Sequence, residues 1–152
     1  MVKETIIETV KDAIAVTSTI VESAERELAW LLPAPMLVMG AQYNIQSKGL
    51  IQKGGRVRGI TTISSPYVET VRELLDTGVD VRHLENYTGS FMLVADKSQS
   101  ISSIHLNVED LSLDDKIVAF WTDDADYAEY LLANFETVWA ESTDAQKRIH
   151  EF

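Results

Sequence analysis

Two histidines and a glutamate are the residues of this chain with the most versatile chemistry. His83 stands two residues before Glu85, and the whole sequence contains three histidines. On a strand these two side chains point to the same face, because alternate residues share a face. His105, on a later predicted strand, would complete a set that can hold a metal ion. The spacing is generic, and a buried histidine paired with a carboxylate is commoner, so we rank a metal-dependent enzyme below the alternatives that follow.

A second group of residues could bind a small molecule without a metal. In an open α/β sheet, ligands occupy the crevice beyond the carboxyl ends of the strands. Phe91 and Trp121, taken singly, are more readily explained as core residues, since large aromatic side chains dominate cores. Tyr87 stands in a polar turn and is the better candidate. The residues predicted at this crevice are Ser64, Glu85, Asn86, Tyr87, Phe91, His105 and Trp121.

The elements that must position these residues alternate between helix and strand. Two segments with the pattern Gly-x-x-Val-Arg, residues 54–58 and 78–82, each follow a helix-like stretch and precede a strand-like one. Glycine supplies the left-handed residue that ends a helix, and the residues after it begin a strand. The predicted strands are residues 28–32, 58–63, 81–85, 91–96, 100–106 and 117–121, of which 91–96 and 100–106 form a hairpin. Helical continuation through residues 28–32 is the competing interpretation.

Helices are predicted over residues 36–53, 65–77 and 125–138, with a final turn or two within 142–152. Together with an N-terminal helix, the order is α-β-α-β-α-β-β-β-α. This order predicts a single-domain α/β fold in which helices lie on the faces of a mixed β-sheet.

Residues 1–25 are predicted to form an amphipathic helix. Apolar and small residues recur at spacings of three and four from Ile7 to Ala24, which is a heptad pattern. Such a helix packs either on its own domain or on the same helix of a second subunit, and its apolar face is broad enough for both. We therefore expect an N-terminal dimerisation or linker helix over residues 1–25 and an α/β domain over residues 26–152.

Composition restricts the partners that this chain can have. It has 152 residues, 45% of them apolar, which suits one buried core. It contains no cysteine, so disulfides and thiolate chemistry are excluded. The formal net charge of −11 repels phosphate backbones and anionic lipid. We expect a soluble, cytoplasmic protein without a cofactor, which meets DNA only through a separate DNA-binding segment or another chain.

Five segments carry a resemblance to a known group of proteins. Their order and spacing resemble the phospholipase D-like effector domains of archaeal transcription regulators, of the TrmB-like and methanogenesis-regulator type, over residues 23–152. The resemblance implies a phospholipase D-like fold and a role in transcriptional regulation. The segments are Glu27–Pro33, Gly54–Ile60, Gly78–Leu84, Phe91–Asp96 and Ala119–Asp124.

The resemblance stops at the catalytic motif. Active phospholipase D-like enzymes carry His-x-Lys-x-x-x-x-Asp, in which histidine attacks phosphorus, lysine binds the phosphoryl oxygens and aspartate orients the histidine. With the motif aligned on Asp96, Gly89 replaces the histidine and Phe91 replaces the lysine. Neither residue can do this chemistry, and an aspartate at a strand end is more often a turn residue. Phosphodiester hydrolysis by this route is therefore not expected.

We favour a catalytically inactive phospholipase D-like regulatory domain that senses a small molecule, mediates homodimerisation, or does both. An effector in the crevice would favour one arrangement of the first helix. An interaction-only protein with a vestigial crevice is the alternative, and an enzyme using His83, Glu85 and His105 comes last. Arg58 and Arg82 are then expected to be scaffold residues beside the crevice rather than anion-binding residues.

Overall fold

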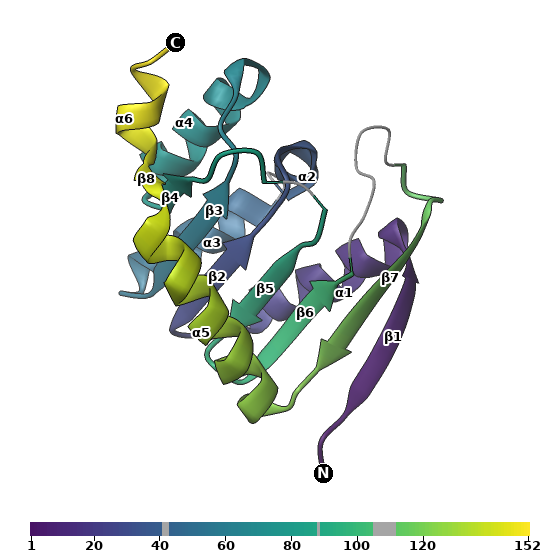
Figure 1. The fold of residues 1–152 in the computed structure, drawn as a ribbon. Helices are drawn as coiled ribbons and strands as arrows, with labels where there is room; N and C mark the ends of the chain where they lie inside the picture. Colours follow the sequence, from purple (N-terminus) through teal and green to yellow (C-terminus); the bar gives the residue numbers. More distant parts are fainter. Residues whose placement is uncertain (41–42, 88, 105–111) are drawn as a thin grey trace.

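One eight-stranded mixed sheet organises the chain. The computed structural model describes residues 1–40, 43–87, 89–104 and 112–152. The strands are β1 (Glu4–Thr9), β2 (Glu27–Leu31), β3 (Arg56–Thr61), β4 (Asp80–His83), β5 (Met92–Ala95), β6 (Gln99–Ser103), β7 (Lys116–Thr122) and β8 (Thr143–Asp144). They lie in the order β1-β7-β6-β5-β2-β3-β4-β8 (Figure 1). β2, β3 and β4 run parallel to one another, and the other neighbouring pairs are antiparallel.

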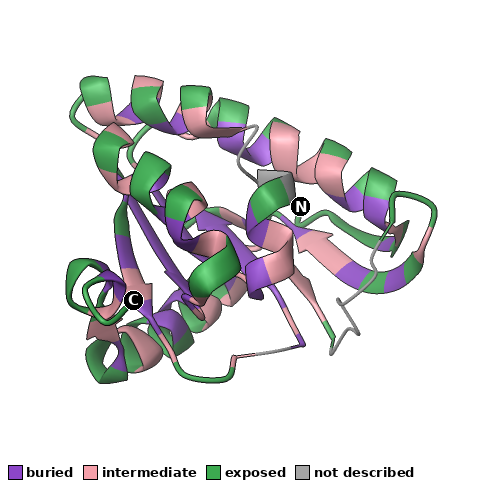
Figure 2. Cartoon of the chain, turned by 90° about the horizontal axis from the view of Figure 1, so that it is seen from above, coloured by how far each residue is buried: buried purple, intermediate pink, exposed green. Residues whose placement is uncertain are grey.

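Helices cover both faces of this sheet, and each face has its own cluster of buried side chains. On one face lie α1 (Val10–Ser23), α2 (Ala34–Gly40), α3 (Asn44–Gln52), the 3₁₀ helix η2 (Ser65–Tyr67) and α4 (Val68–Thr77). α5 (Ala125–Glu141) crosses the other face, and α6 (Ala145–Ile149) packs beside β4 and β8. Figure 2 shows the buried residues along the strands and the exposed ones on the outer sides of the helices.

The predicted fold class is confirmed, and most predicted elements are present. Residues 28–32 lie largely in a buried strand, β2, so the helical interpretation of this segment is wrong. The hairpin predicted over residues 91–106 is present as β5 and β6, and its residues 105–106 lie outside the described residues. The helix predicted over residues 36–53 is instead two helices, α2 and α3. The short edge strand β8 was not predicted, because two residues carry no detectable periodicity.

The N-terminal segment differs most from its prediction. Residues 4–9 form β1, in which Ile6 lies opposite Phe120 of β7, and not the first turns of a helix. The helix begins only at Val10, after the Thr9 side chain accepts a hydrogen bond from the Asp12 N–H at 3.1 Å. Residues 5–9 are rich in β-branched side chains, which favour strands, and the edge of β7 provides a partner. The helical spacing of apolar residues in α1 therefore extends into β1 only by coincidence.

The apolar side of α1 faces the sheet of its own domain. Its buried residues are Val10, Ala13, Ile20 and Val21. In Figure 2 the outer side of this helix is mostly exposed. The broad apolar face that suggested a dimerisation helix is thus used inside the domain.

The arginines of the two Gly-x-x-Val-Arg segments hold α5 against the sheet. Arg58 is buried, lies 5.3 Å from the Trp139 ring centre and pairs with Glu136. This hydrogen bond from Arg58 holds the pKa of Glu136 below its ordinary value. Arg82 also lies 5.3 Å from the Trp139 ring centre, and its Nε donates to Ser142 Oγ at 2.8 Å. Both arginines contact α5 and its C-terminal end, in keeping with the expected scaffold role.

Asp96 anchors the start of β2 from the β5–β6 turn. Its φ of 54° and that of Lys97, 55°, are left-handed, as a tight hairpin turn requires. Its carboxylate accepts hydrogen bonds from the N–H groups of Glu25, Arg26 and Glu27 at 2.9, 2.8 and 2.8 Å. Burial raises the pKa of Asp96, but these three donors outweigh it and hold the pKa below its ordinary value. The prediction that Asp96 is a turn residue is confirmed.

The Asp96→Asn substitution tests this anchor. Asparagine tolerates the left-handed conformation, but its neutral oxygen accepts hydrogen bonds more weakly, so we expect a loss of about 1–2 kcal/mol in the free energy of unfolding at pH 7. The folded pKa of Asp96 is depressed, so the advantage of the wild type is complete above the unfolded value of about 3.9. It declines as the pH falls through the folded value.

Urea unfolding of both proteins between neutral and acid pH measures this difference. Asp80→Asn, which changes an exposed carboxyl at the start of β4, is the control and should show no such trend. A difference between wild type and Asp96→Asn that stays constant with pH would contradict the role of the carboxylate.

Candidate functional site

The strands β2, β3 and β4 all finish at the same end of the sheet, which we call its carboxyl edge, and most of the predicted ligand residues lie there. Ser64 follows β3 and precedes η2, and residues 85–87 follow β4. Because β5 runs antiparallel to β2, pairing Met92 with Leu31, the start of β5 lies at this edge too. The structure therefore brings Ser64, Glu85, Asn86 and Tyr87 to the same edge as Phe91.

His83 is the buried centre of this edge, with 3% of its surface exposed. Its Nδ1 accepts a hydrogen bond from the Ile63 N–H at 2.8 Å, and its Nε2 lies 2.9 Å from Glu85 Oε1. A neutral imidazole that accepts at Nδ1 carries its proton on Nε2, so His83 donates to the carboxylate. This donation lowers the pKa of Glu85, whose side chain is otherwise exposed.

This arrangement does not favour the metal hypothesis. Both ring nitrogens of His83 are engaged, and a metal ligand needs one free lone pair on the imidazole. His105 lies outside the described residues. Within the described ranges, no group of three His, Cys, Asp or Glu side chains could hold a metal ion. The pair of His83 and Glu85 is the buried histidine with a neighbouring carboxylate that the sequence left as the commoner interpretation.

Replacing His83 with leucine tests the structural role of the imidazole. The substitution leaves the buried Ile63 N–H without its acceptor, which should lower the free energy of unfolding by about 1–3 kcal/mol. Chemical denaturation measures the loss. Glu85→Ala is the matched control, because it removes the exposed partner of the same imidazole and should leave stability close to that of the wild type. Equal losses in both variants would argue against a structural role centred on Nδ1.

Tyr87 closes the loop after β4. Its N–H donates to Thr62 Oγ1 at 2.7 Å, and this hydroxyl donates to the Leu84 carbonyl at 2.6 Å. The Tyr87 hydroxyl lies 3.0 Å from Ser90 Oγ. Burial raises the pKa of Tyr87, with the hydrogen bond to Ser90 opposing it, and its ring packs against the cluster on the α5 side. Asn86, exposed with a φ of 53°, forms the preceding turn.

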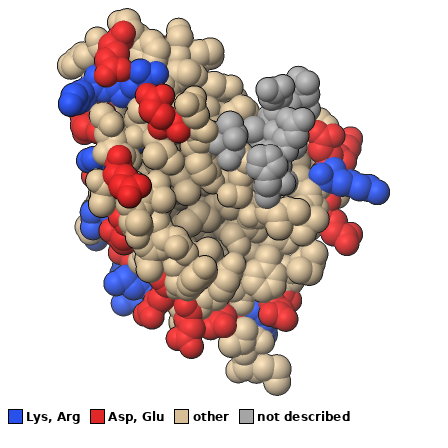
Figure 3. Space-filling view, in the orientation of Figure 1, with Lys and Arg blue, Asp and Glu red and all other residues tan. Residues whose placement is uncertain are grey.

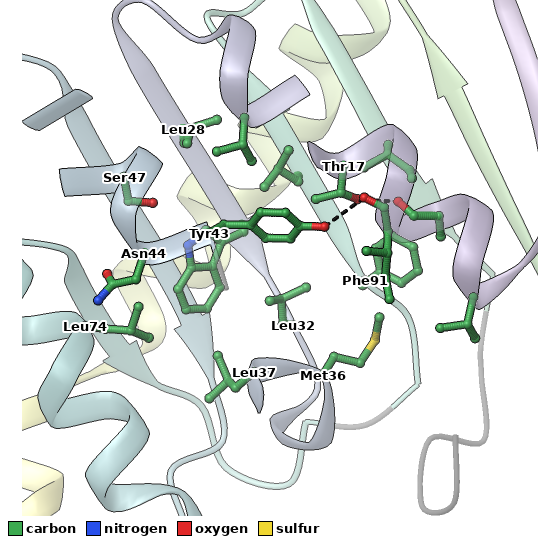
Figure 4. Close-up of a pocket in the computed structure, with 17 residues that line it drawn as sticks. Thr17, Leu28, Leu32, Met36, Leu37, Tyr43, Asn44, Ser47, Leu74 and Phe91 are labelled. Atoms are coloured by element: carbon green, nitrogen blue, oxygen red, sulfur yellow. Dashed lines mark hydrogen bonds between the residues drawn. The ribbon is translucent and has the colours of Figure 1, made fainter. Parts of the chain in front are cut away.

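Phe91 belongs to the opposite face of the sheet. It is 4% exposed and packs in the cluster on the α1 side together with Leu93. Its ring lines an apolar cavity between α1 and the sheet (Figure 4). Gly89 is buried with a φ of 105°. Tyr87 and Phe91 therefore do not form two walls of one crevice, as the sequence suggested, because they pack on different faces of the sheet.

Trp121 lies at the opposite end of the sheet, where β2, β3 and β4 begin, so its assignment to the crevice is wrong. β7 is antiparallel to β6, and the carboxyl end of β7 consequently lies at the edge where β2, β3 and β4 begin. Trp121 stands opposite Thr5 and Ile101, and its Nε1 donates to Gln99 Oε1 at 3.2 Å. The prediction placed every strand end on one edge, which holds only for parallel strands.

Solved structures with the same fold come from several proteins. TrmBL2, described as an archaeal chromatin protein with a novel mode of DNA binding, has a TM-score of 0.72 at 14% identity over 93% of this chain. Nuc from Salmonella typhimurium, a phospholipase D family member, has a TM-score of 0.74 at 11% identity over 95% of this chain. NucT from Helicobacter pylori has a TM-score of 0.74 at 12% identity over 95%.

These likenesses define the class of fold, which is that of phospholipase D. The chain spans 54% of TrmBL2, and it spans 98% of Nuc and 99% of NucT. No protein-family profile matches the sequence, and no curated protein matches it. The predicted phospholipase D-like fold is thus confirmed by structure. Within the described part of the chain, no helix is both long and apolar enough to cross a membrane.

Proposed function

We propose that this chain is a catalytically inactive phospholipase D-like regulatory domain that senses a small molecule. The observation that carries the proposal is the environment of Phe91, the residue at the position of the phosphate-binding lysine. It is 4% exposed and lies in an apolar cluster, where a charged phosphoryl group would lose its hydration without gaining a cation. Gly89, at the position of the nucleophile, has no side chain to attack with.

The regulatory part of the proposal is supported by charge and by the similarity to TrmBL2. The chain corresponds in length to about half of TrmBL2, 54%, and a protein of net charge −11 repels the DNA backbone. We therefore propose that contact with DNA, in a regulator that contains this domain, is made by a different segment or chain. The domain would act by changing its conformational equilibrium when an effector binds.

A hydrolysis assay tests the absence of catalysis. Purified protein is incubated with bis(4-nitrophenyl) phosphate and with single-stranded DNA, in the presence and absence of divalent cations. We expect no turnover above that of His83→Gln prepared in the same way, since that variant alters the buried imidazole that the structure describes beside the predicted crevice. Turnover that copurifies with the wild type and disappears in His83→Gln would contradict the proposal.

A second candidate, self-association, is favoured by an exposed apolar surface on the α5 face of the sheet. α5 lies across β2, β5 and β6, and β7 and β1 extend beyond it (Figure 1). Figure 3 shows few charged side chains on this face between the acidic groups at its margins. We define this surface as the β7 face. Its residues are Ile6, Ile104, Val118, Phe120, Tyr127 and Tyr130.

A second copy of the chain suits the β7 face better than it suits α1. Outward positions of α1 are polar or small, among them Lys11, Asp12 and Glu22. The six residues that define the β7 face are uncharged, and Glu4 and Lys116, charged residues that share this side of the sheet by alternation, are the first residues of β1 and β7. Two acidic copies can therefore meet at the centre of this face without burying an unpaired charge. We therefore propose homodimerisation through this face rather than through the first helix.

Light scattering at several concentrations tests the self-association. We expect the wild type to approach twice its monomer mass of 17.0 kDa. Val118→Glu places a charge in the β7 face and should give a monomer. Val38→Glu changes another exposed valine, on α2 outside this face, and should not alter the mass. A monomeric wild type, or the same mass for both folded variants, would refute dimerisation through the β7 face.

A further inference from the structure

We infer that the cavity beneath α1 binds a small, uncharged and mostly apolar molecule that donates one hydrogen bond. The inference rests on the proposed sensing function, because it names the class of molecule sensed. The cavity has a volume of about 90 Å³ and lies between α1, α2, α3 and the strands β2 and β5 (Figure 4). It differs from the predicted crevice, because Phe91 is the only one of the crevice residues described in the structure that lines it.

The walls of the cavity exclude a charged ligand. Within the described residues, its lining consists of apolar side chains together with four neutral polar ones, and no Asp, Glu, Lys, Arg or His is among them. Burying a phosphate or a carboxylate without a cation costs far more than its contacts return. The four polar residues are Thr17, Tyr43, Asn44 and Ser47.

The polar atoms of the lining are arranged to accept a hydrogen bond. The Tyr43 hydroxyl donates to the Ile14 carbonyl at 2.8 Å, and the Thr17 hydroxyl donates to the Ala13 carbonyl at 2.7 Å. With its proton engaged, the Thr17 oxygen can act only as an acceptor toward a ligand. Asn44 Oδ1, which can only accept, is buried and has no hydrogen-bond partner within the described residues. A ligand with one donor therefore fits this lining.

The size of the cavity limits the ligand to a single small ring or a short branched chain. An engineered cavity of about 150 Å³, lined by Leu, Ile and Phe, stays dry and binds benzene. The present cavity is smaller, about 90 Å³, but Met36 lines it, and methionine side chains adapt their shape. Phenol combines such a ring with one hydroxyl donor and serves as the probe.

An occupant of this cavity would act directly on α1. Two hydroxyls of the lining bond to carbonyls in the first turns of α1, at Ala13 and Ile14. Val10 and Val21 extend the contact along the same helix. Filling the cavity would therefore restrain α1 against α3 and the sheet, and a ligand that prefers this arrangement of α1 would shift the equilibrium toward it.

Amide NMR titrations of the intact protein with phenol, benzene and phenyl phosphate test the inference. We expect phenol to bind with a dissociation constant of about 1 mM or below and to shift amides of α1, α3 and β5. Ala13→Leu fills the cavity and should weaken binding at least about tenfold. Ala15→Leu, the same change on the exposed side of α1, should leave it unchanged. Thr17→Val, which removes an acceptor oxygen and keeps the shape of the side chain, should weaken the binding of phenol but not that of benzene.

Failure of phenol and benzene to bind, or binding of phenyl phosphate as tight as that of phenol, would overturn the inference. Undiminished binding to folded Ala13→Leu would do the same. Thr17→Met replaces Ala13→Leu if the latter does not fold. A charged metabolite that raises the melting temperature and shifts amides of residues 85–87, in a protein that binds neither phenol nor benzene, would overturn this site while leaving the sensing function intact. Phosphodiester hydrolysis would instead refute the proposed function and leave the binding of phenol untouched.

Discussion

The antiparallel pairing of β5 with β2, near the middle of the sheet, is the constraint on which both ends of the domain depend. Because Leu31 lies opposite Met92 and Leu28 opposite Ala95, the two ends of β5 reach opposite edges. At one end of β5, Asp96 lies beside the N–H groups at the start of β2. At its other end, Phe91 lies where β2, β3 and β4 finish. A reversed β5 would exchange these two environments.

The two faces of the sheet differ in the contacts that they make. On the α5 face, Arg58 and Arg82 hold Trp139 between them, and this contact fixes the helix on β3 and β4. On the α1 face, alternation along β5 directs Phe91 and Leu93 into the apolar cluster. A charged side chain at position 91 would lie among apolar neighbours. Phe91, on the face that holds the cavity, offers no cation to a phosphate, and the contacts that hold α5 on the sheet lie on the other face.

Much of the architecture could be predicted from local patterns. Gly78, with a φ of 106°, ends α4 as its place in the repeated segment indicated, and Asp96 lies in the expected turn. Ile7 shows where such patterns fail, because its helical spacing to Val10 continued into a strand. Its membership of β1 depends on pairing with β7, more than a hundred residues further along the chain. Local spacing contains no information about a partner at that distance.

For the candidate site, the sequence by itself determined the chemistry that is missing, and only the tertiary structure decided which residues meet. Gly89 and Phe91 lack the groups needed for this phosphoryl transfer in any fold, because glycine has no side chain and a phenyl ring is neither a nucleophile nor a cation. Which residues lie close together depends instead on the direction of each strand and on the face of the sheet to which each side chain points. These placed Trp121 at the far edge, separated Tyr87 from Phe91, and brought Thr17, Tyr43 and Ser47 around one cavity. Strand direction arises from long-range pairing, which the whole sheet settles together.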